Sequence, residues 1–98
     1  MATFKELGDK YEPLLESFSN FKIGKTGQTI EERYEEEYSD FYDNYEIVGS
    51  STDETTIDEF EIYMIKRFGD LPNCDNEQVG GGAMIKSNEY IVYLMYNK

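Results

Sequence analysis

The strongest strand pattern in this chain lies near its C-terminal end, in Tyr90–Tyr96. This run carries no charge and consists of aromatic, β-branched and other apolar residues, which favour a buried strand. A strand needs partners, so other segments must supply the rest of a sheet. We expect Ala83–Lys86 to form a closing hairpin with it across Ser87–Glu89, and Phe21–Gly24 and Tyr45–Gly49 to be short strands.

Three helices are predicted between these strands, over residues 3–19, 29–43 and 53–68. The first two begin with capping-box patterns, in which a Thr is followed three residues later by a Glu. Pro13 should end or kink the first helix. In the second helix, the apolar stripe consists of Ile30, Tyr34, Tyr38 and Phe41. Gly69 stands where the third helix should stop.

A chain of 98 residues forms one domain, and 39% of its positions are apolar, with nine Tyr and six Phe among them. We expect a single α+β domain covering residues 1–98: an N-terminal helical addition over 1–20, a central part over 21–86 and a final strand over 87–98. No apolar run is long enough to span a bilayer, and no secretion signal is evident. The lone Cys74 fits a reducing, cytoplasmic location, and with no His a zinc site is not expected.

The net charge is −12, from 21 acidic and 9 basic residues. Proteins that bind nucleic acid usually present positive charge to phosphates, so the long-range field of this chain should repel polyanions. One interpretation is a solvated acidic surface that maintains solubility. The other is a surface that imitates nucleic acid or docks on a basic protein.

Two charged residues fall on the apolar faces of predicted helices. Glu61 follows Ile57 by four residues, and a carboxylate there requires a counter-ion, a metal ion or the lip of a cleft. Arg33 could pair with Glu37 one turn later, or point into a cleft together with Glu61. An Arg and a carboxylate on neighbouring helices suit phosphate chemistry, in which one holds the phosphate and the other anchors a metal.

Three segments together resemble the signature of the GIY-YIG nucleases. Residues 21–34 read FKIGKTGQTIEERY, similar to the family's second strand, its turn and the Arg on the helix that follows. Residues 57–65, IDEFEIYMI, resemble the helix whose Glu holds the family's metal ion, and residues 76–81, NEQVGG, resemble the Asn-to-Gly-Gly segment that closes the core.

The family's first strand is missing from its usual place ahead of Phe21. The C-terminal residues 88–98, NEYIVYLMYNK, are very similar to that strand, with Ile91–Tyr93 standing for Gly-Ile-Tyr. The resemblance therefore implies a circularly permuted GIY-YIG domain: a small three-stranded antiparallel sheet flanked by about three helices, with the C-terminal strand beside Phe21–Gly24.

The resemblance also implies roles for individual residues. Tyr93 would position or activate a water, Arg33 would steady the phosphate, and Glu61 would bind one Mg²⁺ or Mn²⁺ ion. Lys22 stands where many members have a second Tyr. The segments that contact substrate in the family supply Lys25, Asn76 and Gly80.

Two function classes follow from these observations. The first is a metal-dependent endonuclease that cleaves phosphodiesters in nucleic acid. The second is a catalytically weak or inactive protein on the nuclease scaffold, an acidic inhibitor or nucleic-acid mimic of the kind phages use against host defences, with a basic protein as partner. Glu37 occupies the position of a His found in many members, and further glutamates surround Arg33.

Overall fold

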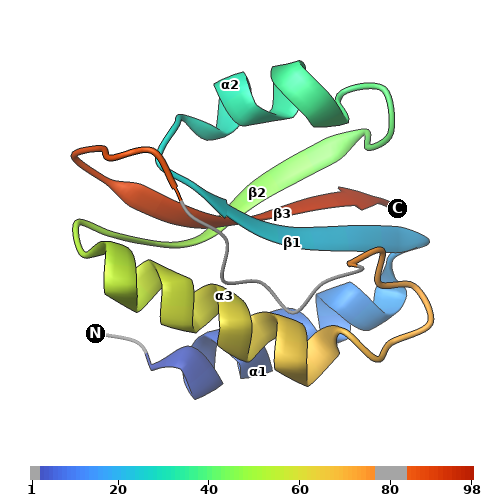
Figure 1. Ribbon diagram of the computed structural model, residues 1–98. Coiled ribbons are helices and arrows are strands. Elements are labelled where there is room, and N and C mark those ends of the chain that lie inside the picture. The colour runs from blue at the N-terminus through green and yellow to red at the C-terminus, as the bar shows by residue number, and fades with distance from the viewer. Residues whose placement is uncertain (1–2, 77–83) are drawn as a thin grey trace.

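The computed structural model describes residues 3–76 and 84–98 and has an α+β fold, with helices on both faces of an antiparallel sheet (Figure 1). Its elements follow in chain order: α1 (Phe4–Ser17), β1 (Asn20–Thr26), α2 (Ile30–Arg33), the π-helical turn η1 (Tyr34–Tyr38), β2 (Asn44–Ser51), α3 (Glu54–Phe68) and β3 (Tyr90–Asn97). Among the described residues, no helix has both the length and the apolar character that crossing a bilayer requires.

The last strand is the centre of the sheet. The strand order is β1-β3-β2, and β3 runs antiparallel to both neighbours. Gly24 of β1 and Ile47 of β2 lie opposite Tyr93 from the two sides. The uninterrupted apolar character of β3 is explained by this position, because its side chains are covered on both faces of the sheet.

Alternate residues of β3 face two separate cores. Tyr90, Val92 and Leu94 join the larger core, which is formed with α1 and α3. Ile91, Tyr93 and Met95 join a smaller core with Ile30 of α2 and the tyrosines of and after η1. In Figure 1 the sheet accordingly lies between α2 on one side and α1 with α3 on the other.

The first helix is continuous through Pro13, so of the two expected effects, an end or a kink, the end does not occur. Thr3 and Glu6 form the predicted capping box at its start. Tyr11 and Leu15 are both buried in the larger core, one on each side of the proline. Their burial offsets the hydrogen bond that the proline removes, a loss of about 3 kcal/mol in an isolated helix.

The second predicted helix is shorter than expected and changes its winding. After α2, the backbone N–H of Ser39 donates to the carbonyl of Tyr34 at 2.9 Å, which closes the wider turn of a π-helix. Tyr38 and Tyr42 are buried against the sheet, whereas Phe41 is 70% exposed. The extra residue in the turn shifts the face that meets the sheet, and the stripe prediction was therefore wrong at Phe41.

The predicted C-terminal hairpin does not form. Met84–Lys86 has no strand structure and Ile85 is 80% exposed, while Ala83 lies outside the described residues. Both edges of β3 are already occupied by β1 and β2, so no position beside β3 is left for a hairpin partner. The expected pairing of the C-terminal strand with Phe21–Gly24 is confirmed.

Candidate functional site

Arg33 lies at the end of α2, on the same face of the sheet as Tyr93. Its Nη1 donates to the Glu37 carboxylate at 3.0 Å, and its guanidinium carbon lies 5.5 Å from the centre of the Tyr38 ring. The Nε atom is buried and has no hydrogen-bond partner among the described residues. Burial by itself would lower the pKa of Arg33, but the hydroxyls of Tyr93 and Tyr38 and the Glu37 carboxylate raise it overall. Of the two arrangements considered, the structure contains the Arg33–Glu37 pair.

Tyr93 is a buried side chain in the middle of the sheet, only 2% exposed. Its hydroxyl is 3.4 Å from the hydroxyl of Tyr38, and its ring covers Gly24 on the neighbouring strand. Burial first, and then the contact with Tyr38, raise the pKa of Tyr93 above the ordinary tyrosine value of 10.0, with Arg33 acting in the opposite direction. A neutral, covered phenol is poorly placed to activate a water from solvent.

Glu61 lies on α3, across the sheet from Tyr93 and Arg33. It is 6% exposed, within the larger core, and its Oε1 lies 3.9 Å from the ammonium nitrogen of Lys25. That same ammonium forms an ion pair with Asp58 one turn earlier on α3. A carboxylate in an apolar helix stripe is thus paired with a buried lysine from β1, which is the counter-ion among the alternatives left open by the sequence.

Among the described residues, those around Glu61 hold a lysine ammonium and do not form a ligand set for Mg²⁺ or Mn²⁺. Lys25 stands at both nearby carboxylates, Asp58 and Glu61, where a metal ion would have to bind. Hard divalent cations need several oxygen ligands around them. In the described part of the chain no three His, Cys, Asp or Glu side chains are grouped to hold such an ion.

Lys22 and Asn76 were also expected in the site, and they lie in different places. Lys22 lies on the Tyr38 side of the sheet, with its ammonium 5.4 Å from the centre of the Tyr38 ring. Asn76 is bonded to the edge of β1: its Oδ1 accepts from the Ile23 N–H at 2.9 Å and its Nδ2 donates to the Ile23 carbonyl at 2.7 Å. Gly80 lies outside the described residues.

The predicted residues therefore form two groups and not one. Arg33, Tyr93 and Lys22 surround Tyr38 on one face of the sheet, and Glu61 with Lys25 is buried on the other. Strand alternation explains the division, because Lys22 and Gly24 face one side of β1 while Ile23 and Lys25 face the other.

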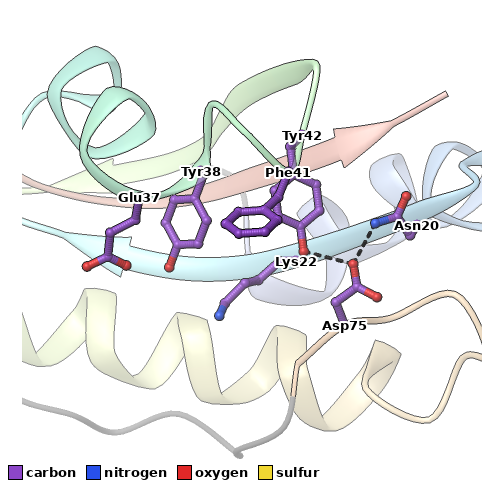
Figure 2. Close-up of a pocket in the computed structure, with 7 residues that line it drawn as sticks. All are labelled: Asn20, Lys22, Glu37, Tyr38, Phe41, Tyr42 and Asp75. Atoms are coloured by element: carbon purple, nitrogen blue, oxygen red, sulfur yellow. Dashed lines mark hydrogen bonds between the residues drawn. The ribbon is translucent and has the colours of Figure 1, made fainter.

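Beside Tyr38 the surface is hollowed into a cavity of about 670 Å³ at the edge of β1 (Figure 2). Its lining comes from β1, from η1 and the turn after it, and from the segment that follows α3: Asn20, Lys22, Glu37, Tyr38, Phe41, Tyr42 and Asp75. Three of these are aromatic and two are carboxylates. We call this hollow the Tyr38 pocket.

Sequence reasoning named Lys22 as a site residue and singled out Glu37 beside Arg33, but it missed the other five residues of the lining. Tyr38 and Phe41 were interpreted as core positions, and Asn20, Tyr42 and Asp75 carried no motif. Asp75 reaches the pocket because its N–H donates to the Phe21 carbonyl at 2.8 Å, which holds its segment along β1. No local spacing pattern signals a contact over such a separation in sequence.

The outer surface of α2, η1 and the following turn is strongly acidic. Its exposed carboxylates, which we call the acidic ridge, are Glu31, Glu32, Glu35, Glu36, Glu37, Asp40 and Asp43. Arg33 is the sole basic residue in the sequence of this segment, and it is paired with Glu37. The ridge thus retains nearly all of its negative charge next to the Tyr38 pocket.

Comparisons of this chain with protein-family models, with curated proteins and with solved structures gave no match. The GIY-YIG resemblance therefore rests on the residues quoted above, and the circular permutation stays a prediction.

Proposed function

We propose that this protein is a non-catalytic binding protein that uses its acidic ridge and the adjoining surface to dock on a basic protein. The observation that carries the proposal is that the charged residues expected to act in catalysis form ion pairs with other residues of the chain. Arg33 is paired with Glu37, Glu61 is paired with Lys25, and the two pairs lie on opposite faces of the sheet.

The ridge supplies the charge for such docking. Complementary charge steers association and selects partners, and it acts over about 8–10 Å at physiological ionic strength. A nucleic-acid ligand would meet repulsion here, whereas a partner rich in Arg and Lys would be attracted. The same charge distribution is what an imitation of nucleic acid requires.

Apolar side chains beside the ridge supply contact area. Phe41, Tyr45 and Ile47 are 70%, 38% and 47% exposed. Tyr45 and Ile47 lie opposite Met95 and Tyr93 of β3, so they share the face of the sheet that carries η1. Exposed aromatic residues next to charge are typical of protein interfaces. A reducing, cytoplasmic compartment suits this function, with Cys74 kept as a thiol.

The test is binding of a defined basic probe, an oligo-arginine peptide, followed by fluorescence anisotropy. We expect the double variant Glu35→Gln/Glu36→Gln to bind it several-fold more weakly, because both carboxylates belong to the ridge. The matched control is Glu16→Gln/Glu59→Gln, which removes the same charge from exposed positions on α1 and α3. Equal loss in the two variants would show attraction to net charge alone and would contradict docking on the ridge.

A second candidate, a metal-dependent endonuclease of GIY-YIG type acting on nucleic acid, is favoured by one observation. β3 pairs with β1 and places Tyr93 opposite Gly24, as a permuted family member requires. Lys25 would have to leave Glu61 before a metal could bind there.

A nicking assay on supercoiled plasmid and on RNA, with Mg²⁺ or with Mn²⁺, decides this candidate. An endonuclease should nick at least one substrate, and both Glu61→Gln and Arg33→Gln should abolish nicking while Glu59→Gln leaves it unchanged. Intact nucleic acid in every reaction of the native protein would remove the nuclease from consideration.

A further inference from the structure

The Tyr38 pocket has the composition of a site for a cationic side chain. Tyr38, Phe41 and Tyr42 follow one another along one side of it, and Lys22 and Asp75 lie below them in the view of Figure 2. The faces of aromatic rings attract cations, and Glu37 and Asp75 add two carboxylates to the lining. Against these, the described residues of the lining include one cation, Lys22. The exposed carboxylates of the neighbouring acidic ridge disfavour an anionic ligand here.

The Asp75 carboxylate is held in a fixed orientation. Its Oδ2 accepts hydrogen bonds from the Asn20 amide at 2.7 Å and from the Tyr42 hydroxyl at 2.8 Å. Asn20 is in turn held by Asn97, whose Nδ2 donates to the Asn20 Oδ1 at 3.0 Å. Both hydrogen bonds that the described residues make to the Asp75 carboxylate use Oδ2, so within this part of the chain Oδ1 is left for an incoming donor.

The aromatic side of the pocket already accommodates cations from the chain itself. The Lys22 ammonium and the Arg33 guanidinium lie 5.4 Å and 5.5 Å from the centre of the Tyr38 ring. Phe41, at 70% exposure, gives an incoming side chain a second apolar surface. A volume of about 670 Å³ is within the range of small-ligand sites and exceeds what one planar guanidinium needs.

We propose that the Tyr38 pocket binds an arginine side chain of the basic partner, with the guanidinium against the aromatic rings and its N–H groups directed at Asp75. Arginine suits this site better than lysine, because a guanidinium stacks on rings and donates to a carboxylate in one planar arrangement. This inference rests on the proposed function and assigns one contact within it.

The first experiment is an NMR titration of the full chain with N-acetyl-arginine amide. The matched ligand control is N-acetyl-citrulline amide, which has nearly the same shape and no charge. We expect the arginine compound to shift the resonances of Asn20, Phe41 and Tyr42 and the citrulline compound to shift them little. N-acetyl-lysine amide should bind more weakly than the arginine compound. Equal shifts from the arginine and citrulline compounds, or shifts confined to residues outside the pocket, would overturn the proposal.

Substitutions at the pocket make the test sharper. Asp75→Asn should weaken arginine binding by about fivefold or more, since it removes the charge and keeps the shape. Asp40→Asn is the matched control, because it removes a ridge carboxylate that does not line the pocket. Lys22→Gln should tighten binding, because it removes the cation nearest to Tyr38, and a gain of affinity cannot come from misfolding. An unchanged affinity in both Asp75→Asn and Lys22→Gln would contradict the assignment.

The oligo-arginine experiment distinguishes failure of the pocket from failure of the proposed function. If the peptide binds the ridge and Asp75→Asn leaves the affinity for the peptide unchanged, the docking function stands and the arginine pocket is wrong. If the arginine compound occupies the pocket and the peptide ignores the ridge, the pocket stands without the proposed function.

Discussion

The absence of a side chain at Gly24 makes room for the ring of Tyr93 on the adjacent strand. A Cβ built on Gly24 would overlap the ring and hydroxyl of Tyr93 on the adjacent strand. Tyr93 can therefore pack close to the backbone of β1 and reach the hydroxyl of Tyr38 at 3.4 Å. Glycine within a strand is commonly found where such a close approach occurs.

We expect Gly24→Ala to lower the free energy of unfolding by about 1–3 kcal/mol, because the added methyl group overpacks the smaller core. Chemical denaturation measures this loss. In the double variant Gly24→Ala/Tyr93→Leu the methyl group should cost much less, since the phenol that it meets is gone. A loss in the double variant equal to the sum of the losses in the two single variants would show that the residues do not interact.

The buried tyrosines predict the alkaline behaviour of the protein. Burial, together with contacts to Tyr38 for Tyr93 and to Asp75 for Tyr42, raises the pKa of both phenols above the value of 10.0 for a free tyrosine. Folding thus favours the neutral form, and this contribution to stability is complete below pH 10 and declines as the pH rises above it. The absorbance of tyrosinate should show part of the nine tyrosines ionising only as the chain unfolds. Titration of all nine near pH 10 in the folded protein would contradict this expectation.

At the residue scale, sequence reasoning succeeded where the contact was local. The spacing of Arg33 and Glu37 on one helix face predicted their pair as one alternative, and the structure contains it. Glu61 was singled out from its helix stripe, but its partner Lys25 is distant in sequence. The Tyr38 pocket depends on Asp75 and Tyr42, whose contact is tertiary and leaves no trace in local spacing.

At the scale of helices and strands, the short segment after α3 covers part of the outer edge of β1. Its Asn76 side chain forms hydrogen bonds with both the N–H and the carbonyl of Ile23 on β1, as a neighbouring strand would. An uncovered strand edge invites pairing with other chains, so this amide has a structural role that needs no catalysis.

Asn76→Ala should destabilise the fold by about 1–3 kcal/mol, because it leaves two half-buried backbone groups of Ile23 without partners. Faster hydrogen exchange at the Ile23 amide, together with a lower denaturation midpoint, would report this loss. Asn88→Ala, at an exposed position before β3, is the control and should leave both quantities unchanged.

The sequence allowed all three helical regions and the three strands to be located, because their caps and apolar spacing are local signals. The errors came from tertiary packing that overrides propensity. Burial of Tyr11 and Leu15 carries α1 past Pro13, and packing of Tyr38 and Tyr42 against the sheet accompanies the π-turn. The hairpin prediction failed because both sides of β3 are filled by β1 and β2.

For the whole molecule, a net charge of −12 on a small domain implies self-repulsion, concentrated along the acidic ridge. We expect added salt to raise Tm, because screening weakens the repulsion between neighbouring carboxylates. At low salt, Glu35→Gln/Glu36→Gln should raise stability by about 1 kcal/mol, or roughly 4–8 °C in Tm. The control Glu16→Gln/Glu59→Gln should gain less, and a Tm that falls with added salt would contradict this account.

The sheet order also has a consequence for synthesis on the ribosome. β1 and β2 are both made before β3, and in the described part of the chain each joins the sheet by pairing with β3. Neither ladder can be completed until Tyr90–Asn97 has left the exit tunnel. Until then the nascent chain exposes two unpaired strands and the apolar faces of its helices. We therefore expect ribosome-bound chains that are arrested before β3 emerges to be cut readily by protease.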